Sequence, residues 1–338
     1  MSDLLLSIFE ATLVFALGVP LATFLAKAIL VLRWRRDPDV RRHGSLPSFL
    51  LIVAPSLATV LWFVSAALHD SEPGHAFSVC SFDHAGFPNC VDSLLLALLL
   101  STVVAIVVTH RWRPTPRGTN ESIDERYAQR LARLCAPGTR LSMLAGRVKP
   151  VGPSAHPICV RGFFRPSVEV STSLMDRLAD SSLEAGLLHE AVHLESHDPA
   201  RFLLATVALA LNPLGFLLLP DLRRWRACRE AVCDQQAVSR SADPLCLAEA
   251  IVSASRLHPP PRPLVAGLGE ASAGLLRLRV HLLMDYASKP RPLPRASSRW
   301  FDAGIALAVI LSPHILGVWP LDGIHGVAEK LIATLGLA

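Results

Sequence analysis

The residues best suited to chemistry are His189-Glu190-Ala191-Val192-His193, in a segment with helical patterning. Two histidines four positions apart project from the same face of a helix, one turn apart, so both imidazoles can reach one tetrahedral zinc ion. Glu190 then sits beside the open position of the metal, where a carboxylate can take a proton from bound water. The motif indicates a zinc-dependent hydrolase with Glu190 as general base. The alternative is a solvated helix face that carries this pattern by chance.

Such a site needs a third protein ligand, and the sequence offers two candidates. His197 continues the same face but lies eight residues from His189, about 12 Å along a helix axis, which is too far for one ion. Glu230 lies in a separate predicted helix, and Asp234 follows it one turn later. One carboxylate can complete the site while the other orients the free N–H of a histidine. We therefore predict that Glu230 is the third ligand and that Asp234 supports it.

The elements that must position these residues are mainly helices. A Ser181…Glu184 capping-box pattern opens the helix that carries the histidines. Two short segments alternate or run apolar like strands. The predicted helices are 121–135, 181–197, 221–239, 244–257 and 275–286, and the predicted strands are 157–160 and 167–171.

The composition favours an integral membrane protein. The 338 residues are 51% hydrophobic and only 18% charged, whereas soluble domains average about 25% charged residues. Apolar content and 26 prolines exclude disorder and coiled coil. The arginines cluster beside apolar runs, which is typical of topology signals and argues against a nucleic-acid partner. Four apolar stretches are long enough to cross a bilayer, at about 4–32, 49–68, 94–109 and 301–318.

Arginine and lysine counts in the loops set the predicted orientation, because such residues collect on the cytoplasmic side. The loop at 69–92 contains none, and its Cys80 and Cys90 could form a disulfide or remain as free thiols. We therefore predict a multi-pass protein of the inner (cytoplasmic) membrane, with the lipid bilayer as a partner and the catalytic domain in the cytosol. Its parts are 1–109 with three transmembrane helices and the outside loop 69–92, 110–299 as the cytosolic domain, 300–320 as the fourth transmembrane helix, and 321–338 as a short outside tail.

The apolar run 202–220 resembles a fifth span, which would separate Glu230 from the histidines. Asn212-Pro213-Leu214-Gly215 interrupts it, and these are strong helix breakers. Its first arm, 202–211, is ten residues long, about 15 Å or half a bilayer. We therefore predict a membrane-dipping helical hairpin that enters and leaves on one side.

These features together resemble the BlaR/MecR-type membrane zinc metallopeptidases, a family of gluzincins. The resemblance covers about residues 1–320, with three spans before the zinc motif and one after the domain. It rests on His189-Glu-Ala-Val-His193, Asp198, Asn212-Pro-Leu214, Glu230-Ala-Val-Cys-Asp234, Gly162-Phe-Phe-Arg-Pro166 before a strand, and the helix around Leu278-Arg-Val280.

The resemblance implies a mostly α polytopic protein with a gluzincin-type α+β domain between spans three and four. It implies zinc bound by His189, His193 and Glu230, with Glu190 as base and Asp234 behind the ligands. It also implies that a strand at Val168, Glu169 and Val170 lies beside the active-site helix and pairs with an extended substrate, the alternative being ordinary sheet structure.

The function implied is a membrane-embedded zinc metalloendopeptidase that cleaves a cytosolic or membrane-adjacent protein, such as a transcriptional repressor, in signal transduction or regulated proteolysis. Antibiotic-sensing members carry a penicillin-binding domain after the last span, and Leu321–Ala338 contains no Ser-x-x-Lys, so β-lactam sensing is not expected. The alternatives are a membrane quality-control peptidase and a non-catalytic receptor or scaffold with structural zinc. Stabilisation of the tetrahedral intermediate is left open between Tyr127, Arg279, His281 and Tyr286, and no oligomeric state is predicted.

Overall fold

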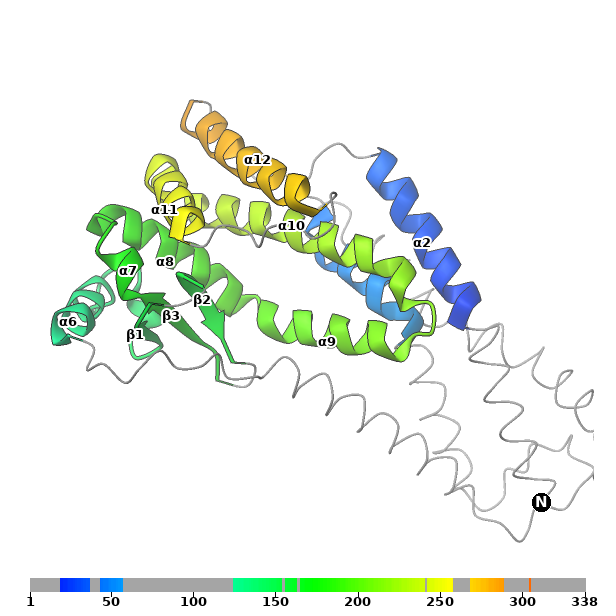
Figure 1. Ribbon diagram of the computed structural model, residues 1–338, viewed down its shortest axis with the longest axis horizontal. Coiled ribbons are helices and arrows are strands. Elements are labelled where there is room, and N and C mark those ends of the chain that lie inside the picture. Colours follow the sequence, from blue (N-terminus) through cyan, green and yellow to red (C-terminus); the bar gives the residue numbers. More distant parts are fainter. Residues whose placement is uncertain are drawn as a thin grey trace, which may run out of the picture.

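The computed structural model describes residues 19–36, 43–56, 124–153, 156–162, 165–240, 242–257, 268–288 and 304. This part of the chain is predominantly helical with one small sheet, which confirms the mostly α prediction (Figure 1). Several predicted features lie outside the described residues: the outside loop with Cys80 and Cys90, the tail 321–338, the span 94–109 and, apart from residue 304, the span 301–318.

The sheet has three strands in the order β1-β3-β2: β1 (Val148–Val151), β2 (Ile158–Arg161) and β3 (Ser167–Ser171). The central strand β3 pairs parallel with β1 and antiparallel with β2. Its alternate residues Val168 and Val170 are fully buried and face the helices, as the period of two requires. β2 and β3 match the predicted strands, while β1 was not predicted.

Helices cover the buried face of this sheet. The helix with the histidines is α8 (Asp180–Glu195), which packs against β2, β3 and α11 (Pro244–Leu257). The shorter α6 (Glu125–Leu134) and α7 (Thr172–Met175) lie beside the sheet. The last described long helix, α12 (Leu268–Ser288), packs on α11 and on α10 (Gly215–Ser239). One hydrophobic core joins these elements, and its fully buried side chains include Leu141, Leu174, Met175, Leu183 and Leu187.

The start of α8 differs from the predicted capping box. The helix begins at Asp180, its N-cap is Ala179, and no side chain caps it. Arg130 instead reaches across from α6 and donates to the Asp180 carboxylate at 2.6 Å. The capping-box prediction was therefore wrong, although the helix itself was placed within two residues of its observed ends.

The next two helices in the chain form a hairpin and lie side by side (Figure 1). α9 (Asp198–Leu211) ends at Asn212, and α10 (Gly215–Ser239) returns. The Asn212 side chain accepts from the Leu214 N–H at 2.8 Å and donates to the Thr23 hydroxyl at 2.9 Å. A side chain at Gly215 would lie only 2.0 Å from the Leu209 carbonyl oxygen, so the turn requires glycine here. The predicted helical hairpin is confirmed.

The predicted transmembrane architecture is not confirmed. In the ranges described, no helix has both the length and the apolar character needed to cross a membrane. This contradicts the predicted four-span fold and the predicted multi-pass location in the inner membrane. Lys27, which lies in the first predicted span, pairs with the buried Asp221 of α10. Trp34 donates to the same carboxylate at 3.1 Å, so α2 (Val19–Arg36) is attached to α10 by polar contacts.

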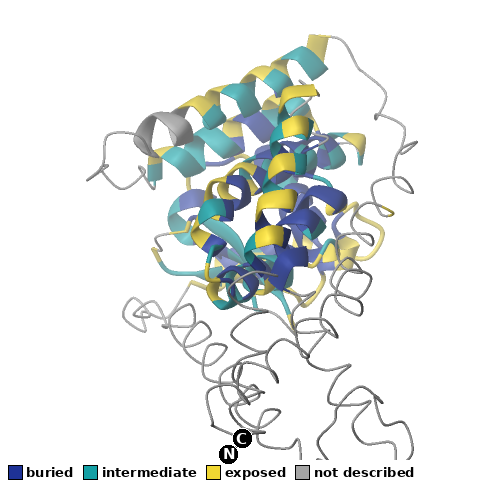
Figure 2. Cartoon of the chain, turned by 90° about the vertical axis from the view of Figure 1, so that its right-hand side faces the viewer, coloured by how far each residue is buried: buried dark blue, intermediate teal, exposed yellow. Residues whose placement is uncertain are grey.

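A second hydrophobic core forms where α2 and the helical residues 46–56 meet α9 and α10, around the fully buried Trp225. α10 passes from this core, at Trp225, into the first core, at Ala237. Its middle section, between the two cores, carries Glu230 and Asp234. Figure 2 shows the buried residues concentrated in the interior of the helical body.

Candidate metal centre

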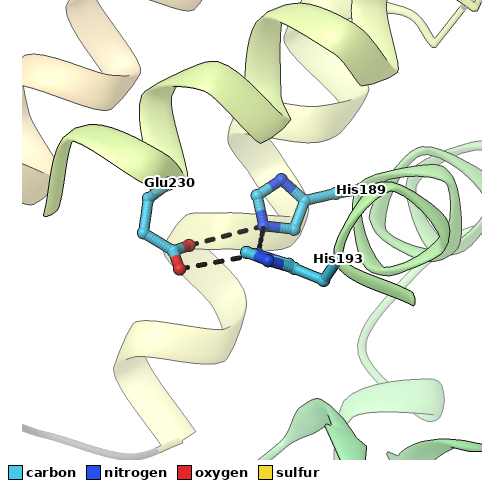
Figure 3. A group of neighbouring side chains, drawn as sticks. All are labelled: His189, His193 and Glu230. Atoms are coloured by element: carbon cyan, nitrogen blue, oxygen red, sulfur yellow. Dashed lines mark hydrogen bonds and ion pairs between the residues drawn. The ribbon is translucent and has the colours of Figure 1, made fainter. Parts of the chain in front are cut away.

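α8 and α10 bring the three predicted ligands together. His189 and His193 project from α8 toward α10, and Glu230 projects from α10 toward them (Figure 3). The two side chains from α8 are only 7% and 10% exposed, whereas the Glu230 side chain is 30% exposed. The site is therefore open on the side of Glu230.

The separations between the ligand atoms match a single small cation. The two histidine Nε2 atoms are 3.1 Å apart, and they lie 3.4 Å and 3.5 Å from the two Glu230 oxygens. Ligands bound at 2.0–2.2 Å in a tetrahedron are separated by about 3.3–3.6 Å. His189, His193 and Glu230 thus form a group that could hold a metal ion.

Each histidine has a carboxylate behind it. His189 Nδ1 lies 2.9 Å from Asp234 Oδ1, a contact with the distance of an ion pair that is not aligned as a hydrogen bond. His193 Nδ1 lies 2.7 Å from Asp198 Oδ2. Such carboxylates keep the proton on Nδ1 and leave Nε2 free to bind a metal. This is the role predicted for Asp234, and Asp198 shares it.

Asp198 was part of the sequence pattern but was not predicted to serve the site. It is fully buried at the start of α9, where it also accepts from Arg229 at 2.8 Å and Arg201 at 3.2 Å. The chain reaches this position through His197, whose φ of 54° is left-handed. Its place directly after the histidine helix was the available sequence signal, but its two arginine partners could not be read from the sequence.

A second group of possible ligands comprises His193, Asp198 and Cys233. It would have to use His193 Nδ1, which lies 3.5 Å from Cys233 Sγ. The two guanidinium groups on Asp198 already supply positive charge at that carboxylate, so adding a cation there is unfavourable. The electrostatics favour the first group as the metal site.

Opposed pKa shifts accompany this arrangement. Burial lowers the pKa of His189, but the contacts with Asp234 and Glu230 outweigh it and raise that pKa to about 9. Burial likewise opposes the rise at His193, whose pKa is held well above the usual value by Glu230 and Asp198. Burial would raise the pKa of Glu230, yet His193 and Arg279 hold it well below the usual range. The same carboxylates that favour protonated histidines would also favour a bound cation.

Glu190 is buried and follows Gly186 by one helical turn, and the Gly186 face of α8 lies against Ile158 of β2. Burial and then the charge of Glu190 raise the pKa of the Cys159 thiol, on β2, to about 11. No hydrogen bond or ion pair in the described ranges involves the Glu190 carboxylate, which is therefore available to act on a bound molecule.

Arg279, one of four candidates for stabilising an intermediate, reaches the site from α12. It donates to both Asp234 oxygens at 2.7 Å and approaches Glu230 Oε2 at 3.1 Å. Tyr127 instead bonds to Asp176 beside α6, and His281 is exposed on α12. His197 is exposed as well, and its ring contacts the carbonyl of Glu195. His197 is thus not a ligand, as predicted.

The predicted substrate strand needs correction. Val168, Glu169 and Val170 lie on β3, whose two edges are both occupied, by β1 and by β2. A substrate backbone therefore cannot pair with β3. Within the described residues, the sheet edge beside α8 belongs to β2.

The site and the fold define a helical protein with a His-His-Glu group able to hold a metal ion. Comparisons with protein-family models, curated proteins and solved structures found no match. The resemblance to BlaR/MecR-type peptidases remains a prediction from the sequence.

Proposed function

We propose that this protein is a zinc-dependent metalloendopeptidase that cleaves protein substrates, with His189, His193 and Glu230 as zinc ligands and Glu190 as general base. The observation that carries the proposal is the spacing of 3.1–3.5 Å among the two histidine Nε2 atoms and the Glu230 carboxylate oxygens, with a base available on the residue next to His189. Two histidines with one carboxylate are a ligand set typical of catalytic zinc.

Zinc bound to this set supplies a Lewis acid and lowers the pKa of a coordinated water. Glu190 takes the proton from the attacking water and passes it to the leaving amine. Asp234 and Asp198 hold the two imidazoles with Nε2 directed at the metal, at Nδ1 distances of 2.9 Å and 2.7 Å. The roles are divided: α8 provides the base, and carboxylates from α9 and α10 orient its histidines.

An extended peptide is the substrate form that fits beside α8. The β2 edge is unpaired within the described residues, and such an edge can add a strand from another chain. Ile158 of β2 lies 3.8 Å from the position of a Cβ on Gly186, one helical turn before Glu190, so a peptide along this edge would pass beside the part of α8 that carries the base. That the substrate is a regulator such as a transcriptional repressor stays a prediction.

A purely structural zinc is the alternative from the sequence. Structural sites close their fourth position with Cys or His. The nearest thiol, Cys233, lies on the Nδ1 side of His193, away from the shared Nε2 position. This placement favours an open and therefore catalytic site.

The experiment is a comparison of wild type with Glu190→Gln, using a denatured protein such as casein as substrate. The variant should retain zinc and lose cleavage, because it keeps the shape but not the base. Glu184→Gln, on the same helix at a partly exposed position, is the matched control and should keep both. Full cleavage by Glu190→Gln at equal zinc content would refute the mechanism.

A further inference from the structure

We propose that Arg279 is a positioning residue that holds the ligand Glu230 and the supporting Asp234 in the geometry needed for metal binding. The inference rests on the proposed metal site. If it holds, the affinity for metal also depends on α12, a helix that contributes no ligand.

The contacts are those of a clamp on two carboxylates. Arg279 Nε and Nη2 donate to the two oxygens of Asp234, each at 2.7 Å, and Nη1 lies 3.1 Å from Glu230 Oε2. The arginine side chain is only 13% exposed, so these contacts are shielded from water. One guanidinium thus fixes a ligand and the residue behind another ligand.

The geometry calls for arginine rather than any cation. A guanidinium presents five N–H donors in a rigid plane, and its fork matches a carboxylate through two parallel bonds. A lysine ammonium could replace the charge, but it cannot make the paired bonds to Asp234 and the third contact to Glu230 together. Charge and geometry can therefore be separated by substitution.

The same contacts argue against a direct catalytic role. All three nitrogens of Arg279 face carboxylates, so the group is committed before a substrate arrives. Its positive charge would repel a metal ion, but Glu230 and Asp234 together carry two negative charges beside it. Loss of orientation should therefore outweigh relief of repulsion when Arg279 is removed.

The test measures zinc dissociation constants by competition with a chromophoric chelator, for full-length wild type, Arg279→Met, Arg279→Lys and Arg277→Met. Arg279→Met should bind zinc about 10- to 100-fold more weakly, the usual effect of losing a residue that orients ligands. Arg279→Lys should recover only part of this affinity. Arg277 is exposed on the same helix, so Arg277→Met should bind like wild type.

Co²⁺ bound in place of zinc gives a second measurement, because its visible spectrum depends on the ligand geometry. Arg279→Lys, which keeps the buried charge, should fold and still show an altered spectrum. Wild-type affinity and spectrum in Arg279→Lys, or wild-type affinity in Arg279→Met, would overturn the proposal. Failure of wild type itself to bind zinc would instead refute the proposed function.

Discussion

Replacing Asp198 by Asn tests the buried polar network behind His193. The carboxylate is fully buried and contacts His193 at 2.7 Å, Arg229 at 2.8 Å and Arg201 at 3.2 Å. Asparagine has nearly the same shape but no charge. The substitution therefore leaves the Arg229 side chain, only 6% exposed, without its counter-ion.

The expected cost follows from that burial. Removing one partner of a buried ion pair destabilises a protein by about 3–5 kcal/mol, because the other charge stays desolvated. Zinc affinity should also fall about 10- to 100-fold, because His193 loses the group that orients it.

Urea unfolding with a chelator present measures the first effect, since bound metal would otherwise add its own stabilisation. The matched control is Glu195→Gln. Glu195 makes a similarly short ion pair with Arg240, at 2.6 Å, but this pair is partly exposed to solvent. The side chain of Glu195 is 42% exposed and that of Arg240 is 33% exposed. Such exposed pairs contribute about 0–1 kcal/mol.

A double variant makes the result decisive. Asp198→Asn with Arg229→Gln removes both charges, so it should be less destabilised than the sum of the single variants. Additive costs, or a cost for Asp198→Asn as small as that of the surface control, would refute the reasoning.

Zinc binding should release protons and tighten as the pH rises from about 6.5 to 9, because the metal must displace a proton from His189, whose pKa the contacts with Asp234 and Glu230 raise from 6.5 to about 9. In the metal-free protein, protonated His189 contributes stability below about pH 6.5, and this contribution is lost as the pH rises through 9. Calorimetry in several buffers measures the proton release, and thermal unfolding with chelator measures the stability. Zinc affinity independent of pH would contradict both expectations. Gly186→Ala should be tolerated, or stabilise by up to about 1 kcal/mol through helix propensity, because its new Cβ would lie 3.5 Å from the Ala250 side chain. Gly44→Ala should lower the melting temperature, because its Cβ would lie 2.7 Å from the backbone of α10. A lower melting temperature for Gly186→Ala than for Gly44→Ala would contradict the packing described at these two glycines.

Local patterns predicted the parts of the site that local chemistry determines. The spacing of His189 and His193 fixes their common helix face, and Asn212-Pro-Leu214 fixes the turn that returns the chain to Glu230. These signals act over a few residues, so one sequence suffices to read them.

The errors concern partners far apart in the chain. Lys27 lies in the first predicted span, and its partner Asp221 is 194 positions away, so this ion pair could not be read from the local sequence. The pairing of β3 on both edges depends on β1, a short strand with no clear alternation. Arg279 could be named as a candidate, but its contacts with α10 depend on how α12 packs. Apolar composition likewise indicated spans where the described helices pack against one another.

X-ray absorption at the zinc edge of the purified protein tests the metal centre most directly. The account predicts about one zinc per chain with nitrogen and oxygen neighbours at about 2.0–2.2 Å and no sulfur. Glu230→Ala should change this spectrum, and His197→Ala should not. A sulfur neighbour at about 2.3 Å would place the metal at Cys233, and absence of bound zinc would leave the histidines without their proposed role; either result would contradict the account.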